Sequence, residues 1–355
     1  MSRFFSDKYS NLTPYTPGEQ PQDKKYLKLN TNESPFPPSP KVLKAVEEEA
    51  EKLELYSDPE CEKLREKGAE IFAVNKNQIV FTNGSDEALN FAFMAFADEK
   101  RPLAFSDITY GFYPVFALLN NIPFTEIPLK DDFSIDVNDY VGINKTIVIA
   151  NPNAPTGLSL SLKDIEMILQ SNPNNVVIID EAYVDFGAES AIKLINDYEN
   201  LLVTGTFSKS RSMAGARLGF AIGPEKLIKD LNTIRFSTNP YNINRMTSAA
   251  GFAAFEENDY YMNNCKVIAE NRTFLKNELE KLGFFVLPSK ANFLFAKSER
   301  IDGEELYLKL KEKGVLIRHF SKERIKNFNR ITIGTKEQTE KFIKAVKKIF
   351  EEEGK

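Results

Sequence analysis

Short apolar runs alternate with amphipathic stretches along the chain from residue 78 onward. The apolar runs are residues 79–81, 103–105, 146–150, 176–179 and 201–204. Strands that are buried on both faces of a sheet have this continuous apolar character, and helices between them supply the crossovers of a parallel sheet. The pattern therefore predicts an α/β fold in which helices cover a mostly parallel central sheet.

The pattern changes after about residue 245. Two long charged helices are predicted at about residues 257–282 and 336–353, and they bracket shorter strands at residues 284–286, 293–295, 315–317 and 330–333. Helices gathered around a few short strands are typical of an α+β domain. We therefore expect a large domain at residues 39–245 and a smaller domain at residues 246–355.

The first forty residues are rich in proline, asparagine and threonine. The segment Ser34-Pro-Phe-Pro-Pro-Ser-Pro40 cannot continue a helix or a central strand, because proline lacks the backbone N–H that both structures need. We interpret residues 1–38 as an extended arm. Residues 41–55 have helical composition, with apolar positions recurring among glutamates and lysines.

Composition narrows the kind of partner. The chain has 355 residues, of which 42% are hydrophobic and 27% are charged, and this is ordinary for a globular protein of about two domains. Its formal net charge of −5 gives no sign of a nucleic-acid-binding surface. No apolar run approaches the ~18 residues of a membrane span, and no export signal is seen. We therefore expect small-molecule partners, with no nucleic acid and no membrane.

The counts of histidine and cysteine argue against several kinds of site. The single histidine, His319, argues against catalytic triads and against metal sites built from several histidines, and we interpret it as a solvated or packing residue. Cys61 and Cys265 form no C-x-x-C pattern, so we expect structural cysteines in a reduced, cytoplasmic setting. Chemistry is expected from Lys, Asp, Tyr, Arg or a bound cofactor, without a metal.

Two segments that follow predicted strands carry candidate binding groups. Gly84-Ser85-Asp86 opens a predicted helix, so its backbone N–H groups can face an anion, although a serine or aspartate here can also simply cap the helix. Asp180 ends a buried strand, at the edge where open α/β sheets bind ligands. Its carboxylate can pair with a pyridinium nitrogen, or instead with nearby backbone or an arginine.

A third segment, from Ser208 to Arg217, contains a candidate nucleophile. Lys209 is flanked by hydroxyl groups and followed by a turn of small residues and an arginine. A lysine that is desolvated beside cationic groups can act as an amine nucleophile, and Ser208 and Arg217 can bind a phosphate. A solvated lysine in a surface loop is the alternative.

The order of these motifs resembles the fold-type I pyridoxal-phosphate (PLP) aminotransferases over nearly the whole chain. The motifs are Asn151-Pro-Asn-Ala-Pro-Thr-Gly157, Asp180-Glu-Ala-Tyr183, and Ser208-Lys209 with Arg217. Further segments are similar to the class II subgroup of histidinol-phosphate aminotransferases: residues 12–18, 29–35, 55–59, 180–186, 240–242 and 330–334. The resemblance implies a PLP cofactor and exchange of an amino group between glutamate and a small phosphorylated substrate, most simply histidinol phosphate in histidine biosynthesis.

The resemblance also implies residue roles at the cofactor. Lys209 is the implied Schiff-base lysine and proton carrier, Asp180 pairs with the pyridine nitrogen, and Tyr183 hydrogen-bonds the phenolic oxygen. Tyr110 is the implied stacking residue. The remaining implied contacts, mostly to the cofactor phosphate, are Gly84, Ser85, Asp86, Asn153, Thr206, Ser208, Arg217 and Tyr56.

Other implied roles concern the substrate and a second subunit. Tyr56 matches a residue that reaches the cofactor phosphate of a neighbouring subunit, so a homodimer with shared active sites is expected. Arg330 matches the arginine that grips the acidic group of the substrate, with Arg318 as a helper. Tyr15 and Asn32 correspond to parts of the arm that close over the substrate.

Two positions depart from the family pattern. Ala154 stands where an asparagine usually donates to the phenolic oxygen, so Tyr183 is expected to carry that contact, helped by Asn153. Arg211 is more basic than the usual residue, and it is either a second phosphate or substrate contact or a solvated charge. Three alternatives stay open: an aminotransferase for another phosphorylated amino alcohol or an aromatic amino acid, a phospho-amino-acid decarboxylase, and a PLP-binding protein without turnover.

Overall fold

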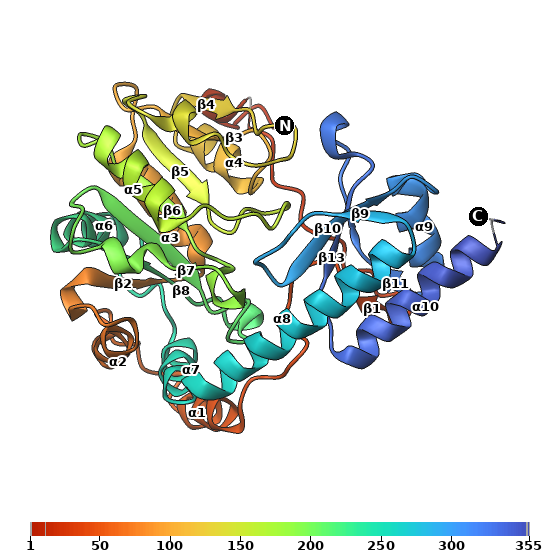
Figure 1. Ribbon diagram of the computed structural model, residues 1–355. Helices are drawn as coiled ribbons and strands as arrows, with labels where there is room; N and C mark the ends of the chain where they lie inside the picture. The colour runs from red at the N-terminus through yellow and green to blue at the C-terminus, as the bar shows by residue number, and fades with distance from the viewer. Residues whose placement is uncertain (1, 11, 353, 355) are drawn as a thin grey trace.

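A seven-stranded sheet forms the centre of the larger domain (Figure 1). The computed structural model describes residues 2–10, 12–352 and 354, so residue 353, the expected end of the last helix, lies outside it. The strand order is β2-β8-β7-β6-β5-β3-β4. The strands are β2 (Ile79–Thr82), β3 (Leu103–Ser106), β4 (Phe124–Ile127), β5 (Thr146–Ala150), β6 (Val177–Asp180), β7 (Leu201–Thr206) and β8 (Gly219–Ile222).

The predicted fold class is confirmed. Strands β4, β3, β5, β6 and β7 are parallel to one another, whereas β8 pairs antiparallel with β7 and β2. The helices of this domain are α2 (Glu62–Phe72), α3 (Ser85–Phe96), α4 (Phe112–Leu119), α5 (Leu162–Ser171), α6 (Glu225–Thr238) and α7 (Arg245–Glu256). Of these, α3, α4 and α5 link strands of the sheet.

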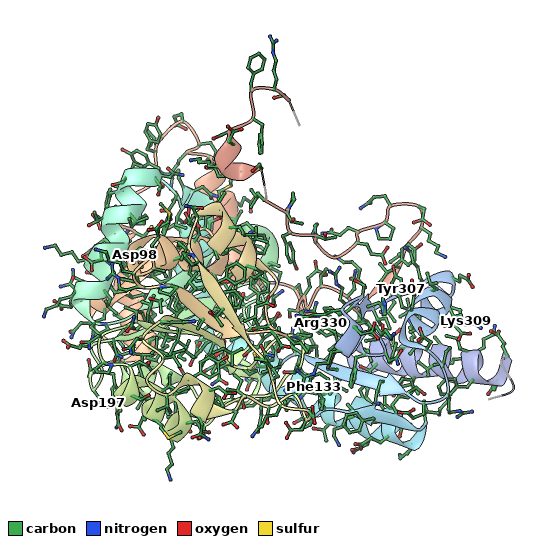
Figure 2. All side chains as sticks on the ribbon, turned by 90° about the horizontal axis from the view of Figure 1, so that it is seen from above. Asp98, Phe133, Asp197, Tyr307, Lys309 and Arg330 are labelled. Carbon is green, nitrogen blue, oxygen red and sulfur yellow. The ribbon has the colours of Figure 1, made fainter. Side chains whose placement is uncertain are left out.

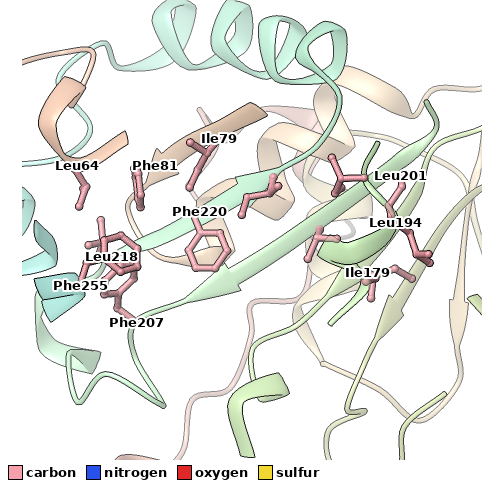
Figure 3. Packing of buried hydrophobic residues seen from close by; sticks show 14 of the residues in the cluster. Leu64, Ile79, Phe81, Ile179, Leu194, Leu201, Phe207, Leu218, Phe220 and Phe255 are labelled. Carbon is pink, nitrogen blue, oxygen red and sulfur yellow. The ribbon is translucent and has the colours of Figure 1, made fainter. Parts of the chain in front are cut away.

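Alternating residues of each strand enter two apolar cores, one on each face of the sheet. In β6, Val177 and Ile179 belong to one core, whereas Ile178 belongs to the other. Aromatic residues fill the first core, where Phe207 and Phe255 have ring centroids 4.9 Å apart (Figure 3). Burial on both faces explains why these strands read as unbroken apolar runs.

The smaller domain has its own sheet and core. Its four strands run in the order β12-β13-β10-β9, all antiparallel. They are β9 (Phe284–Val286), β10 (Phe293–Ser298), β12 (Arg318–His319) and β13 (Asn329–Thr332). The helices that pack on this sheet are α8 (Asn258–Lys281), α9 (Gly303–Glu312) and α10 (Lys336–Glu352), and α8 extends from the larger domain into the smaller one (Figure 1). No helix in the described ranges is long and apolar enough to cross a membrane.

The arm contributes a strand to the smaller domain. Strand β1 (Leu27–Lys28) pairs in parallel with β11 (Val315–Leu316), which forms a separate two-stranded sheet. The expected single strand at residues 315–317 is therefore divided into β11 and β12, which have different partners. After this strand the chain returns to the larger domain, where helix α1 (Pro40–Ala50) packs against α7.

Helix α1 is shorter than the sequence pattern suggests. It ends at Ala50, although the helical composition continues to residue 55. Leu53 and Leu55 are more than half exposed, so no burial of their side chains stabilises another helical turn.

Packing also bears on the division into domains. Helix α7, which begins at the expected boundary near residue 245, contributes Ala250, Ala254 and Phe255 to the core of the larger domain. In α8, Tyr261 still belongs to that core, whereas Cys265 belongs to the core of the smaller domain. On these contacts, the change from one core to the other falls within α8.

Candidate active site

Two neighbouring cavities lie where the arm and both domains meet. The sheet-end cavity, of about 420 Å³, is lined by residues at the carboxyl ends of β6 and β7, including Asp180 and Ser208. The arm cavity, of about 580 Å³, is lined by Tyr15, Arg318 and Arg330 among others. Both cavities have the size of small-molecule sites, and they share five lining residues: Thr31, Tyr110, Ala154, Tyr183 and Lys209.

One end of the sheet-end cavity is built to hold an anion. Helix α3 begins directly after Gly84, whose φ of +79° is in the region that favours glycine. A Cβ at Gly84 would lie 2.6 Å from Nη2 of Arg217, and one at Gly219 would lie 2.3 Å from the backbone nitrogen of Ser85. The backbone therefore approaches Arg217 at a helix N-terminus, where phosphate groups bind.

Hydroxyl groups and an ion pair also line the anion-binding end of the sheet-end cavity. Thr206 donates to the hydroxyl oxygen of Ser208 over 3.0 Å, and both residues line the cavity. Nη2 of Arg217 lies 3.0 Å from Oδ2 of Asp86. Neither Ser85 nor Asp86 caps α3, because the N-cap residue is Gly84 and has no side chain. The observed geometry thus favours the phosphate cradle over the capping interpretation.

Asp180 lies buried at the end of β6. Its carboxylate accepts a hydrogen bond of 2.8 Å from the Tyr113 hydroxyl and a longer one of 3.3 Å from Thr204. Desolvation by burial raises the pKa of Asp180 to about 6, and the bonds from Tyr113 and Thr204 act in the opposite direction. Within the described residues no Lys or Arg pairs with this carboxylate, so a protonated pyridine nitrogen would supply the missing positive partner.

Lys209 projects into the space that both cavities share. Its Nζ donates to the backbone carbonyl of Thr31 over 3.0 Å. Desolvation lowers the pKa of Lys209 to about 8, and the positive charges of Arg330 and Arg217 act in the same direction. The negative charges of Glu33 and Asp86 oppose the shift. An amine with this pKa is partly neutral near pH 7 to 8, as a nucleophile must be.

Tyr110 forms part of the wall between the cavities. Its hydroxyl donates to Oδ1 of Asp86 over 2.8 Å, and its ring centroid lies 6.2 Å from that of Tyr15. Tyr15 in turn stacks on Phe112, with centroids 4.2 Å apart. The Tyr110 ring is therefore held at its hydroxyl and on one side, as a stacking surface for a planar ligand requires.

Arg330 and Arg318 bring positive charge to the arm cavity. Nη2 of Arg330 donates to the carbonyl of Asn30 over 3.1 Å, whereas its buried Nε has no partner among the described residues. Arg318 donates to the carbonyls of Pro17 and Thr16 over 3.3 and 3.4 Å. Figure 2 shows Arg330 at the junction of the two domains. Two arginines that line one cavity fit a carboxylate or phosphate ligand.

Tyr183 and Asn32 meet at the wall of the arm cavity. Nδ2 of Asn32 donates to the Tyr183 hydroxyl over 3.0 Å, and both residues line that cavity. Asn32 is 1% exposed, so it belongs to the wall and is not a mobile part of the arm surface.

Several expected contacts are not brought to the cavities of this chain. Asn153 lines neither cavity, because its side chain bonds to Ile108, Thr109 and Thr156. Tyr56 is 79% exposed and stacks on Tyr241, with centroids 4.5 Å apart. A contact of Tyr56 with a cofactor therefore needs a second subunit.

Arg211 takes neither of the roles considered for it. Its side chain is buried, its Nη2 donates to Asn258 over 2.9 Å, and its Nη1 lies 3.7 Å from Oδ2 of Asp185. The guanidinium also lies over the rings of Phe207 and Phe255. Arg211 thus joins the segment that carries Lys209 to the segment that follows Tyr183. The expectation of a ligand contact or a solvated charge is wrong, because aromatic packing encloses this arginine.

His319 and the cysteines play packing roles. The His319 ring stacks on Tyr307 with centroids 6.0 Å apart, although it also borders the arm cavity. Cys61 and Cys265 are buried and unpaired, and burial raises the pKa of their thiols to about 11 and about 12. No cluster of His, Cys, Asp and Glu in the part of the chain that the structure describes could hold a metal ion.

Tyr113 was not expected at the site. It lies three positions after Tyr110, in helix α4, and it is fully buried among Phe93 and Phe105. An aromatic residue in an apolar helix is normally interpreted as core filling. The only signal for a further role is its hydroxyl group, since a buried tyrosine hydroxyl normally finds a partner.

The groups that line the sheet-end cavity fit PLP. The sheet-end cavity offers a cradle for the phosphate, an aromatic surface for the ring, a carboxylate for the ring nitrogen and an amine for the aldehyde. These groups come from the carboxyl ends of β2, β3, β6 and β7, and Ser208 and Lys209 share the segment after β7. All lie at the edge where open α/β sheets bind their ligands.

Comparisons with known proteins identify the family of the chain. The family model for aminotransferase class I and II matches residues 24–346. A histidinol-phosphate aminotransferase from Brachyspira hyodysenteriae is 51% identical over 352 residues, which cover 99% of this chain and 99% of that protein. One from Clostridium botulinum is 47% identical over 351 residues, with the same coverage of 99% and 99%. The histidinol-phosphate aminotransferase of Sinorhizobium meliloti, solved in complex with pyridoxal-5'-phosphate, has the same fold, with a TM-score of 0.85 at 23% identity and coverage of 93% of this chain and 92% of that one.

Proposed function

The chain belongs to the aminotransferase class I and II family of PLP-dependent enzymes, and on this premise we propose its substrates. It exchanges an amino group between glutamate and L-histidinol phosphate, with 2-oxoglutarate and imidazole-acetol phosphate as the keto partners, and so serves histidine biosynthesis. The relatives that cover the whole chain support this substrate pair. The observation that carries it is the convergence of two arginines, Arg330 and Arg318, on the arm cavity beside Lys209.

One arginine can serve both halves of the reaction. Glutamate presents a carboxylate and histidinol phosphate presents a phosphate, and the planar guanidinium can bind either oxyanion through two parallel N–H donors. Arg318, in the same cavity, adds a second positive charge for the more highly charged phosphate. Two arginines at one end of the arm cavity therefore account for a substrate pair of unlike shape.

The remaining residues orient the reactants and move a proton. PLP, when bound, supplies an electron sink for the bond that breaks at the substrate α-carbon. Asp180 holds the ring nitrogen protonated, because a buried carboxylate without a positive partner favours a cation beside it. Lys209 takes the proton from the α-carbon as a neutral amine, and its depressed pKa makes that form accessible near neutral pH. Tyr15, stacked on Phe112, forms part of the wall of the arm cavity, where the substrate would lie.

The proposed assembly is a cytoplasmic homodimer with shared active sites. Tyr56 and Tyr241 form an exposed aromatic pair, and Leu53 and Leu55 beside them are also more than half exposed. An apolar surface of this kind fits burial against a second copy of the chain. The two buried, unpaired cysteines fit a reducing compartment.

A half-reaction experiment tests the substrate. Glutamate converts the cofactor of the purified enzyme to its amino form, and the return of the original absorbance is then measured with one keto compound at a time. We expect imidazole-acetol phosphate to be faster than phenylpyruvate and dihydroxyacetone phosphate, because only it offers both the phosphate and the imidazole ring. A preference below about tenfold would contradict the substrate assignment. Release of carbon dioxide from a phosphorylated amino acid would indicate a decarboxylase instead.

A further inference from the structure

Position 154 offers no hydrogen-bond donor to a ligand. Ala154 borders both cavities, and its methyl group packs with Ala291 and Phe293 beside the Tyr183 ring. Asn153, its neighbour, uses its side chain within the protein. A negatively charged phenolic oxygen beside this wall must therefore find its donor elsewhere, because a buried acceptor is costly to leave unpaired.

Asn32, which bonds to Tyr183, is held by four hydrogen bonds. Its backbone N–H donates to the Thr332 hydroxyl over 3.0 Å, and that hydroxyl donates to Oδ1 of Asn32 over 3.0 Å. Its carbonyl accepts from Nδ2 of Asn292 over 3.0 Å. The fourth contact is the bond from its Nδ2 to Tyr183. Because Thr332 holds Oδ1, the amide can present only its NH₂ group to the tyrosine.

The backbone of Asn32 supports the same conclusion. Its φ is +55°, a left-handed conformation that asparagine tolerates better than most residues. The residue is also fully buried, at 1% exposure. A strained and enclosed residue with all its polar groups bonded acts as a fixed reference point for its neighbours.

The bond from Asn32 determines what the Tyr183 hydroxyl can do. The hydroxyl oxygen accepts from Asn32, so its own proton must point in another direction, and no acceptor among residues 2–10, 12–352 and 354 takes it. Desolvation raises the pKa of Tyr183, so the proton stays on the oxygen at neutral pH. Accepting one hydrogen bond also strengthens the hydroxyl as a donor.

We propose that Asn32 is a positioning residue that aims the Tyr183 proton at the phenolic oxygen of the bound cofactor. The Asn32–Tyr183 pair then supplies alone the polarisation that an amide at position 154 would share. Thr332, two residues after Arg330 on β13, supports this role because its hydroxyl holds the Asn32 amide in place. This inference rests on the proposed function, because it needs PLP bound through Lys209.

The pH midpoint of the bound-cofactor absorbance is the measurement that tests this pair. At that midpoint the proton shared between the phenolic oxygen and the lysine-linkage nitrogen is lost, and the oxygen is left with an unshared negative charge. A hydrogen-bond donor stabilises that deprotonated form. Loss of a donor therefore raises the midpoint, and an added donor lowers it.

Three variants of the holoenzyme are expected to change the pH midpoint in different ways. Asn32→Ala should raise the midpoint by roughly 0.5 to 1 pH unit, the size expected from one hydrogen bond. Ala154→Asn should lower it by a similar amount, because the new amide can reach the cavity that Ala154 borders. The double variant should return toward the wild-type midpoint, which a merely structural role for Asn32 does not predict.

Asn30→Ala is the matched control. Asn30 lies two residues upstream in the same arm and is equally buried, but its side chain bonds to the carbonyl of Glu19 and not to Tyr183. An equal shift in Asn30→Ala, or an unchanged midpoint in folded Asn32→Ala, overturns the proposal. If Asn32→Ala does not fold, Ala154→Asn tests the proposal in its place. An unchanged midpoint in Ala154→Asn would mean that the phenolic oxygen needs no donor from position 154, and it would overturn the proposal. A wild-type protein without a lysine-linked cofactor absorbance would instead refute the proposed function.

Discussion

The Tyr113 hydroxyl donates a hydrogen bond of 2.8 Å to Oδ2 of Asp180, and both residues are buried beside the sheet-end cavity. This bond favours the charged form of the carboxylate that we propose as the partner of the ring nitrogen. Tyr113→Phe removes it with almost no change in volume. We expect kcat to fall about tenfold and PLP to dissociate faster, because one hydrogen bond to a charged group contributes ~1.5–3 kcal/mol.

A second tyrosine provides the control for this variant. Tyr140 is also buried in the larger domain and lines neither cavity; its hydroxyl lies 2.9 Å from that of Ser106, which borders the arm cavity. Tyr140→Phe should lower thermal stability slightly and leave kcat and PLP dissociation unchanged. Equal kinetic losses in the two variants would show that Tyr113 contributes only to packing.

Lys209→Ala should abolish transamination and the lysine-linked absorbance of the cofactor. No other amine is placed to replace it: Lys322, the other lysine among the described residues that line the cavities, is held to the carbonyl of Asp107 at 2.6 Å. Borohydride reduction followed by peptide mapping checks the linkage. Lys322→Ala should retain the adduct on Lys209, and an adduct found on another lysine of either variant would contradict the assignment.

Capture of PLP by the apoprotein should accelerate through a pH midpoint near 8. Only the neutral amine attacks the aldehyde, and the pKa of Lys209 is lowered from 10.5 to about 8, mainly by desolvation. At pH 7 roughly a tenth of the amine is then neutral, compared with fewer than about one in a thousand for an ordinary lysine. Stopped-flow absorbance over a pH series gives the midpoint.

The charge of Glu33 provides an internal check on this midpoint. Glu33 favours the ammonium form of Lys209, so Glu33→Gln should move the midpoint to lower pH. A midpoint near 10 in the wild-type protein, or a shift to higher pH in Glu33→Gln, would refute the electrostatic account of the site.

Arg330→Ala should weaken both half-reactions. Its guanidinium is the proposed anchor for glutamate and for the phosphorylated substrate, and loss of charge-assisted bonds of ~1.5–3 kcal/mol corresponds to a rise of about 10- to 100-fold in KM for each. Arg318→Ala should have a smaller effect, because its donors already serve arm carbonyls. Impairment of only one half-reaction would show that the two substrates use different anchors.

Arg211→Ala should reduce stability more than it reduces substrate affinity. The variant loses a bond to Asn258 and leaves Asp185 without its partner, but the Asp185 side chain is 34% exposed and water can solvate it. We expect a loss of about 1–3 kcal/mol, measured by chemical unfolding of the holoenzyme. Arg101→Ala breaks an exposed pair with Asp98 and should cost less than about 1 kcal/mol. A large rise in KM for Arg211→Ala would restore the ligand-binding role.

Local pattern was enough to predict the architecture, because strands buried on both faces leave an unbroken apolar run in the sequence. Two strands of the central sheet were not predicted. Strand β4, at the edge of the sheet, has two exposed residues among its four. Strand β8 is buried and apolar, but it enters the sheet antiparallel without a crossover helix, so the alternation of strand and helix is missing there. Short or half-exposed strands are defined by their neighbours in the fold rather than by their own composition.

The residues of the candidate site were also only partly predictable from the sequence. Lys209 and Asp180 could be proposed from their positions after predicted strands, and family resemblance supplied Arg330. The contact between Tyr113 and Asp180 depends on the packing of α4 against β6, across 67 residues of sequence, and no local pattern encodes it. The enclosure of Arg211 likewise depends on Phe255, which belongs to a distant helix.

The pairing of strand β1 with β11 has a consequence for the order of folding. The arm is synthesised first, yet Asn32 binds Thr332, 300 residues later in the chain. Closing so long a loop costs entropy that only the completed C-terminal half can offset. We therefore expect the Asn32–Tyr183 contact to be completed only after Thr332 has been synthesised. Chains truncated before Thr332 should lack a finished active site, which couples catalytic competence to completion of synthesis.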